Sequence, residues 1–228
     1  MNWIKKFASL NETVLGINRR NLQFIYPGSP RAFYPLADDK VETKKVLEKA
    51  GLPAPPSYSI IGNMGQLEDQ WRSAVHHPSL AVKPSMGRGG GGILILHKTE
   101  NNTWQKTSGK PVSEWQILGH IADIIFGVYS FGGNDRAIIE YKVNNHPLLQ
   151  SLYAHGVPDI RIITYRNRPV MGMLRIPTDR SDGRANLHQG ALGIALNISS
   201  GHIGEGILKN RVYHHHPDSG MEFFGLHL

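Results

Sequence analysis

Apolar residues occur along this chain in short runs separated by glycine- and proline-rich turns, which predicts a mixture of helices and strands. Apolar positions recur at helical spacing in three segments: 39–50, 66–75 and 113–125. Runs rich in branched apolar residues predict strands at 57–61, 80–82, 93–96, 137–143, 159–165, 170–175 and 191–197. This order of helices, strands and hairpins predicts an α+β fold with mainly antiparallel sheets.

Capping signals set the ends of two predicted helices. Asp39 stands three residues before Glu42, an arrangement that opens helices, and Gly51 is placed to end the same helix. Ser113 and Gln116 repeat the pattern before the third helix. We expect Trp115 and the isoleucines that follow it at helical spacing to face the core.

The segment from Lys83 to Gly92 carries the strongest chemical signal. Its four consecutive glycines, Gly89–Gly92, lie between two predicted strands and are therefore expected at the tip of a hairpin. Glycines allow backbone N–H groups to wrap closely around an anion, and Lys83 and Arg88 add positive charge beside them. The segment predicts a flexible flap over nucleotide phosphates; the alternative is a surface hairpin without a ligand.

Other glycine-rich phosphate motifs do not fit this segment. Gly87, Gly89 and Gly92 satisfy the dinucleotide-binding spacing, but that motif requires a helix after the loop, and the sequence that follows is strand-like. The Gly-Lys-Ser/Thr ending of a Walker A loop is missing, as are the His-Arg-Asp and Asp-Phe-Gly tripeptides of protein kinases.

Several polar residues near the second predicted hairpin are suited to holding an anion. Counted back from the turn at 166–169, Arg161 and Arg175 fall nearly opposite each other, and an anion between them would remove their repulsion. The alternative is that both are simply exposed. In the polar loop 181–190, Arg184 is suited to bidentate contact with a phosphoryl group and His188 to orienting a substrate.

Charge and composition narrow the classes of partner. The 228 residues include 25 Lys and Arg against 18 Asp and Glu, a net charge of +7 that favours an anionic partner. No nucleic-acid-binding motif accompanies this charge, so a nucleic-acid partner is not expected. A basic RNA-binding protein is the least favoured alternative function, because only the charge supports it. The chain has no cysteine and no apolar run of about 20 residues. We expect a cytoplasmic protein without a membrane partner.

Consecutive histidines at His214–His216 raise the question of a metal site. Neighbouring side chains on a strand point to opposite faces, so three consecutive histidines do not share one ion easily. We therefore expect an exposed approach to the turn at 217–220.

In their order along the chain, these segments resemble the ATP-grasp superfamily, most closely its α-L-glutamate ligase-related branch, which is similar to the ligase that adds glutamates to a ribosomal protein. The resemblance runs from about Leu15 to the end, through the segments at 38–40, 83–92, 159–161 and 184–188. It implies an N-terminal segment, residues 1–37, followed by two α+β lobes, residues 38–135 and 136–228, that grip ATP between them. It also implies a carboxylate–amine ligase that forms an amide or peptide bond through an acyl phosphate, with glutamate or another small acidic or peptide substrate.

The resemblance assigns roles residue by residue. Lys40 and Lys83 correspond to lysines that bind ATP phosphates, and the segment from Glu140 to Val143 to the hinge that binds adenine and ribose. The implied nucleotide-binding set is Lys40, Lys83, Gly87, Arg88, Gly89, Gly90, Gly91, Gly92, Glu140, Tyr141, Lys142 and Val143. The residues implied to stabilise phosphoryl transfer are Arg161, Arg175, Arg184, Asn186 and His188.

One part of the family pattern is missing. ATP-grasp ligases hold Mg²⁺ through an acidic residue and a later Glu-x-Asn, but the one Glu-x-Asn here is Glu100–Asn102, after the glycine segment. No metal ligand is identified, so we expect a C-terminal part that is incomplete, with ATP bound weakly and Mg²⁺ placed poorly. The alternative function is a catalytically impaired ATP-binding module or a fragment of such a ligase. Uncovered apolar residues near Phe223 and Phe224 are expected to favour homo-oligomers.

Overall fold

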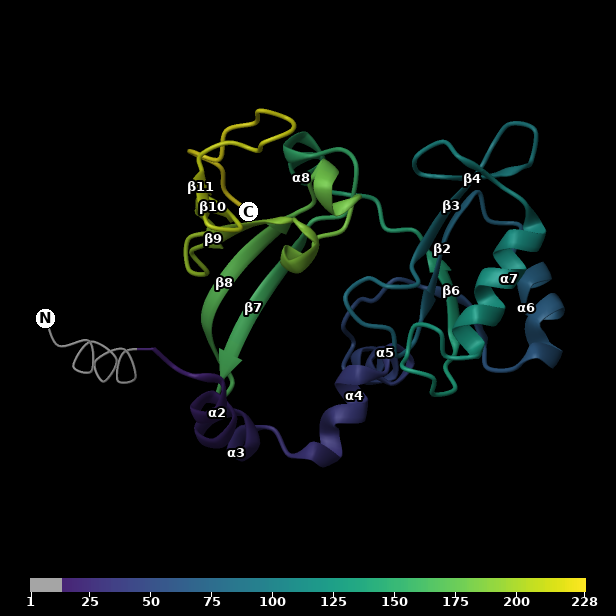
Figure 1. Cartoon of the computed structure of the whole chain (residues 1–228), viewed down its shortest axis with the longest axis horizontal. Coiled ribbons are helices and arrows are strands. Elements are labelled where there is room, and N and C mark those ends of the chain that lie inside the picture. Colours follow the sequence, from purple (N-terminus) through teal and green to yellow (C-terminus); the bar gives the residue numbers. More distant parts are fainter. Residues whose placement is uncertain (1–13) are drawn as a thin grey trace, which may run out of the picture.

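Two antiparallel β-sheets form the framework of the computed structural model, which describes residues 14–228 (Figure 1). The part of the expected N-terminal segment at 1–13 lies outside the described residues. The expected α+β class with mainly antiparallel sheets is confirmed. None of the helices within 14–228 is both long and apolar enough to cross a membrane.

The first sheet has six strands in the order β1-β6-β2-β3-β4-β5. Their bounds are Ser57–Ile61, Ala137–Tyr141, Ser79–Pro84, Leu94–Lys98, Trp104–Lys106 and Pro111–Val112. β2 and β3 pair antiparallel, so the hairpin expected around the glycine segment is confirmed. β6 inserts between β1 and β2, and the first sheet therefore extends beyond residue 136, where the second lobe was expected to begin.

Helices α6 (Leu67–Ala74) and α7 (Glu114–Ile125) pack together on one face of this sheet (Figure 1). α7 begins with the expected capping box, since Ser113 and Gln116 each accept a hydrogen bond from the other's backbone N–H. Four isoleucines of α7 are buried. Trp115 is instead 81% exposed, so its expected place in the core is wrong.

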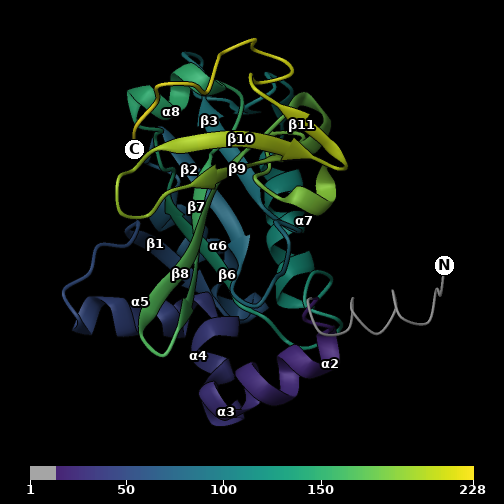
Figure 2. The ribbon, with the colours of Figure 1, turned by 90° about the vertical axis from the view of Figure 1, so that its left-hand side faces the viewer.

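Helix α5 (Lys40–Lys49) lies on the other side of the first sheet, facing the second sheet (Figures 1 and 2). Asp39 caps it by accepting a hydrogen bond from the backbone N–H of Val41 at 2.9 Å. The helix begins where the capping pattern predicts, and Gly51 follows its end with a positive φ of 66°.

The second sheet has five strands in the order β11-β10-β9-β8-β7. Their bounds are Arg211–Tyr213, Ile203–Leu208, Leu192–Leu196, Arg168–Ile176 and Asp159–Tyr165. A separate apolar core forms here around Leu174, Ile194 and Phe223. Phe223 is thus buried, contrary to the expectation of an uncovered strand, while Phe224 is 94% exposed. Helix α8 (Pro147–Leu152) covers this core.

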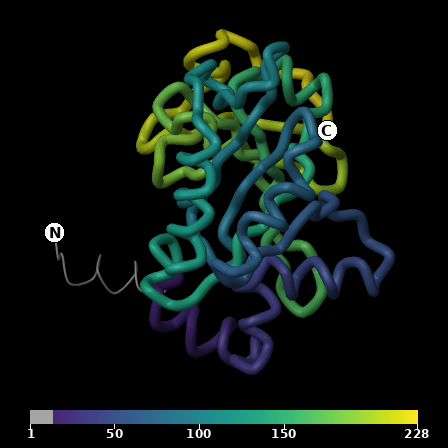
Figure 3. The backbone as a smooth tube through the Cα atoms, turned by 90° about the vertical axis from the view of Figure 1, so that its right-hand side faces the viewer, coloured from purple at the N-terminus to yellow at the C-terminus, as the bar shows by residue number. Residues whose placement is uncertain are grey.

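Short helical turns precede the first sheet. They are α2 (Ile17–Arg20), η1 (Asn21–Ile25), α3 (Tyr26–Gly28), η2 (Arg31–Phe33) and α4 (Tyr34–Asp38). α2, η1 and α3 follow one another directly from Ile17 to Gly28, and Pro30 stands just beyond the end of this run. The backbone view in Figure 3 shows this purple run at one end of the molecule, opposite the yellow C-terminal strands.

Candidate functional site

The glycine loop, residues 85–93, connects β2 to β3 at one end of the first sheet. Gly89, Gly90 and Gly92 have positive φ values of 62°, 81° and 75°, a conformation that favours glycine. Among residues 14–228, no acceptor receives the backbone N–H groups of residues 87–90, whereas that of Gly91 donates to Arg88 O. Unpaired N–H groups on a loop with positive φ values form a surface that can receive phosphate oxygens.

We call the first sheet with its helices the first lobe, and the second sheet with α8 the second lobe. Both ends of the glycine loop are fixed to the first lobe. Lys40 Nζ donates to the carbonyl oxygens of Ser85 and Gly87 at 3.1 and 2.8 Å. At the other end, His120 Nε2 lies 2.8 Å from Gly92 O, to which it can donate. A Cβ atom on Gly92 would approach the ring of Tyr129 to 2.6 Å, so only glycine fits there. The freedom expected of a flap is therefore restricted to the tip.

The tip of the glycine loop meets the second lobe. Asn186 Nδ2 donates to Gly89 O at 3.2 Å, and a Cβ atom on Gly90 would lie 3.6 Å from Arg184 Cδ. The polar loop 181–190 thus places two of its predicted site residues against the glycines of the first lobe. Residues separated by almost a hundred positions in the sequence come together here.

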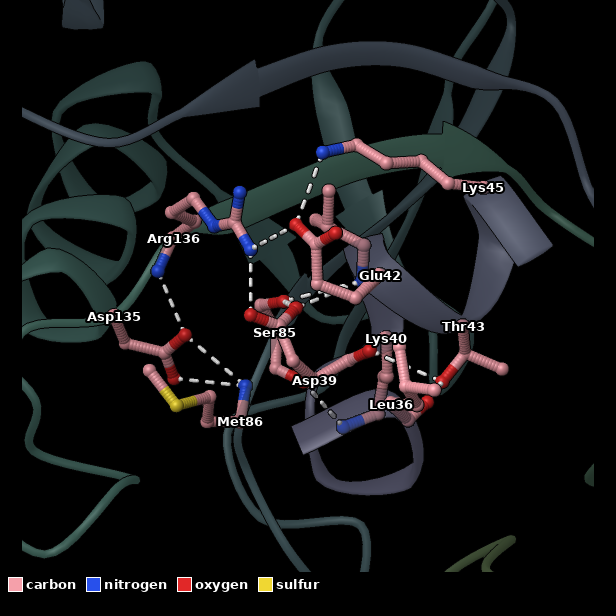
Figure 4. A network of polar contacts seen from close by, with 11 residues as sticks. Leu36, Asp39, Lys40, Glu42, Thr43, Lys45, Ser85, Met86, Asp135 and Arg136 are labelled. Carbon is pink, nitrogen blue, oxygen red and sulfur yellow. Dashed lines mark hydrogen bonds and ion pairs between the residues drawn. The ribbon is translucent and has the colours of Figure 1, made fainter. Parts of the chain in front are cut away.

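A polar network holds the start of α5 against the beginning of the glycine loop (Figure 4). Asp39 accepts hydrogen bonds from Ser85 Oγ and from Arg136 Nη2, the latter at 2.5 Å. Asp135 accepts from the backbone N–H groups of Met86, at 3.0 Å, and of Arg136, at 2.7 Å. Burial alone raises the pKa of Asp39, but the hydrogen bonds from Ser85 and Arg136 outweigh it and lower that pKa below 3.8.

The sequence pattern did not predict this network. The signal available was the pair Asp135-Arg136, two charged residues directly before the apolar run at 137–139 that begins β6. A charged pair at that position needs partners, because the strand end is buried. The network positions Lys40, which follows Asp39 and contacts the glycine loop.

Glu140 lies buried at the end of β6 and pairs with two lysines. Its carboxylate contacts Lys83 Nζ, and Lys44 Nζ approaches it to 2.5 Å. Burial, followed by the nearby charge of Lys83, lowers the pKa of Lys40. Lys40, Lys83 and Glu140 therefore belong to one electrostatic cluster beside the glycine loop. The segment after Tyr141 leads out of the first sheet toward α8, and its role as the hinge that binds adenine and ribose stays a prediction.

The second hairpin pairs its arginines differently from the expected register. The backbone of Arg161 lies opposite Met173, and that of Arg175 opposite Asp159. Arg175 makes two hydrogen bonds of 2.6 Å with the Asp159 carboxylate, so an intramolecular partner balances its charge. Within residues 14–228, neither a hydrogen bond nor an ion pair joins Arg161, Arg175 or His188 to the glycine loop. Their roles in phosphoryl transfer stay predictions.

His216 differs from its two neighbours. It is fully buried, and its Nε2 lies 2.8 Å from Pro177 O, whereas His214 and His215 are exposed. The backbone N–H groups of Asp218 and Ser219 donate to its Nδ1 at 3.2 Å. The expectation of an entirely exposed stretch is therefore wrong for His216, which fixes the turn at 217–220.

In the part of the chain from residue 14 onward, His, Asp and Glu side chains form no group of three that could hold a metal ion. Glu100–Asn102 lies in the turn between β3 and β4, in the first sheet. The carboxylate of Asp182 lies 3.9 Å from Arg184 Nη2.

Comparison with known proteins gives one positive finding. A search among curated proteins returns no significant match. The sequence model of a family described as sugar-transfer associated ATP-grasp matches residues 19–228. It supports the ATP-grasp superfamily expected from the sequence but not the glutamate ligase-related branch. Since the match covers most of the chain, and the two antiparallel sheets are consistent with an ATP-grasp fold, the chain belongs to the sugar-transfer associated ATP-grasp family.

Proposed function

We propose that this chain binds ATP between its two sheets and uses it to join a carboxylate to an amine. The observation that carries the proposal is the meeting of the glycine loop with Arg184 and Asn186 of the second lobe. A loop with unpaired N–H groups, lined by lysines and met by an arginine, suits a polyphosphate. Membership of an ATP-grasp family supports the same ligand.

The proposed roles of the residues differ with their positions. The N–H groups of the glycine loop and the lysines at 40 and 83 bind the phosphates, and the segment from Glu140 to Val143 binds the adenine and ribose. Arg184 neutralises charge that develops as the terminal phosphoryl group is transferred, and Asn186 holds the loop tip against the second lobe. Arg161, Arg175 and His188 are assigned to the same step from the resemblance.

The proposed reaction has two steps. A carboxylate oxygen of the acid attacks the γ-phosphorus of ATP, the bond to the bridging oxygen breaks, and ADP leaves. The amine nitrogen then attacks the acyl carbon, inorganic phosphate leaves, and the amine gives up a proton to form the amide. Glutamate or another acidic molecule is the proposed acid.

Mg²⁺ accompanies ATP in ATP-grasp proteins generally. It is commonly held by one or two carboxylates together with phosphate oxygens. The described residues offer Asp182 beside Arg184 but no cluster of carboxylates there. In the proposed site, lysine, arginine and backbone N–H groups therefore make the contacts with the phosphates.

A matched pair of lysine variants tests nucleotide binding. Lys44 and Lys83 both pair with Glu140 and are equally buried, but only Lys83 is next to the glycine loop in the chain. Lys83→Ala removes a charge-assisted contact of about 1.5–3 kcal/mol and should weaken ATP binding about tenfold to a hundredfold in calorimetry. Lys44→Ala should leave ATP affinity within about twofold. Equal effects of the two variants would contradict the assigned role of Lys83.

Turnover is tested separately from binding. ADP formation and phosphate release are measured for the 228-residue chain with ATP, Mg²⁺ and a panel of acids and amines. ADP that appears only when an acid and an amine are both present supports the ligase. ATP binding without ADP formation would favour the alternative, an ATP-binding module without turnover.

A further inference from the structure

One end of the molecule combines exposed apolar side chains with arginines. We call it the basic apolar end and define it as residues 14–33 together with the β7–β8 hairpin tip, residues 165–171. The rings of Phe24 and Tyr165 join the two segments, with centroids 5.5 Å apart. Figures 1 and 2 show the hairpin tip beside the α2–α3 run. The exposed large apolar residues of this end are Val14, Leu15, Ile17, Leu22, Phe24, Tyr26, Phe33, Tyr165, Val170 and Met171.

The charge of the basic apolar end is entirely positive. It contains five arginines (19, 20, 31, 166 and 168) and no Asp or Glu. Arg31 and Arg166 lie over the rings of Tyr26 and Tyr165, at 5.5 and 5.3 Å from their centroids.

We propose that the basic apolar end docks on an anionic phospholipid membrane surface. Short amphipathic segments that expose large apolar residues beside arginines insert at the boundary between headgroups and acyl chains. Arginines are attracted there by anionic lipids, and aromatic residues are favoured at that depth. Such docking requires no spanning helix, so it is compatible with the absence of one in residues 14–228. It departs from the expectation of no membrane partner, which was based on the lack of a long apolar run.

A second copy of the chain suits this surface less well. A two-fold contact would set the same arginines against each other without any carboxylate of this end to pair them. The surface also ends in a hairpin turn and short helices that protrude from the sheet (Figure 1), whereas a flat sheet edge alone would favour strand pairing. Charge complementarity therefore selects an anionic, fluid surface.

The chain supplies a matched control for the test. The turn between β7 and β8 reads Arg166-Asn167-Arg168, and the turn between β10 and β11 reads Lys209-Asn210-Arg211. The first basic residue of each turn has a positive φ, 49° and 55° respectively. Reversing both charges in either turn changes the net charge equally and places glutamate in the same backbone conformation. The two double variants differ in position alone.

The experiment measures flotation of the full chain with vesicles of phosphatidylcholine alone or with added phosphatidylserine. The unaltered chain should bind the anionic vesicles in 50 mM salt and be released in 500 mM salt. Arg166→Glu/Arg168→Glu should weaken this partition by about 25-fold or more, since each arginine near such a surface contributes about fivefold. Lys209→Glu/Arg211→Glu should retain most of the binding, and both variants should bind ATP like the unaltered chain.

Apolar substitutions complete the test. Phe33→Ser should weaken vesicle binding, whereas Trp115→Ser, at an exposed residue outside this end, should not. Absence of binding by the unaltered chain, or equal losses in the two turn variants, would overturn the proposal. A dimer that dissociates on Phe33→Ser, without vesicle binding, would assign this end to a second copy.

Discussion

Glu140→Gln provides a direct measure of how strongly the electrostatic cluster holds the first lobe together. The substitution keeps the shape of the side chain but removes its charge, which leaves Lys44 and Lys83 without a carboxylate. The side chain of Glu140 is 6% exposed and those of the two lysines are 17% exposed. Water therefore replaces little of the lost interaction.

The size of the effect follows from this burial. Removing one partner of a buried ion pair costs about 3–5 kcal/mol. The partial hydration of both lysines, and the ability of glutamine to accept one hydrogen bond, place the expected loss at the lower end, about 3 kcal/mol. For a chain of this size the midpoint of thermal unfolding should fall by about 6–12 °C.

Urea unfolding followed by tryptophan fluorescence gives the change in the free energy of unfolding. Glu68→Gln serves as the control, because Glu68 and Arg72 are 3.7 Å apart and both about three-quarters exposed. Its expected loss is below about 0.5 kcal/mol. If Glu140→Gln loses less than about 1 kcal/mol, or no more than the control, the cluster does not stabilise the fold as argued.

Two further predictions concern the glycine loop. Asn186→Ala removes the hydrogen bond to Gly89 O, so ATP should dissociate faster in stopped-flow measurements, by about threefold to tenfold; an unchanged rate would mean that this contact does not retain the nucleotide. Burial lowers the pKa of His120 from 6.5, despite its hydrogen bond to Gly92, so its imidazole stays neutral in the folded chain while the unfolded chain binds a proton. The contribution of His120 to stability should therefore decrease as the pH falls below 6.5. His120→Gln should have a flatter dependence of unfolding free energy on pH between 6.5 and 5; parallel curves for the two proteins would contradict this account.

Local patterns predicted the local structure well. The capping residues Asp39 and Ser113 marked the starts of α5 and α7, because a cap depends only on residues two or three positions apart. The glycine loop was likewise recognisable, since its two flanking apolar runs can pair across it. The proximity of Arg184 and Asn186 to this loop came from the order of motifs in the resembled family and not from their spacing.

The sequence-based predictions that were wrong depend on how distant parts of the chain are arranged. The expected register of the second hairpin assumed a four-residue turn, but the turn has two residues, and the register shifts between Ile163 and Thr164. Trp115 carries an apolar side chain on a helix whose buried face is already filled by isoleucines, so the sequence pattern alone could not show its exposure. The insertion of β6 between two earlier strands depends on contacts that no local pattern encodes.

The hydrogen bond from Asn186 to Gly89 O at the loop tip has a consequence for how the two lobes close. One hydrogen bond of this kind contributes about 1 kcal/mol, so by itself it would keep the lobes joined in only about five of every six molecules. Because this contact is weak, the lobes separate often enough for a ligand to enter between them. A polyphosphate that touches both sides would shift the population toward the joined form by its own differential affinity. The nucleotide would then act as the missing part of the interface between the lobes.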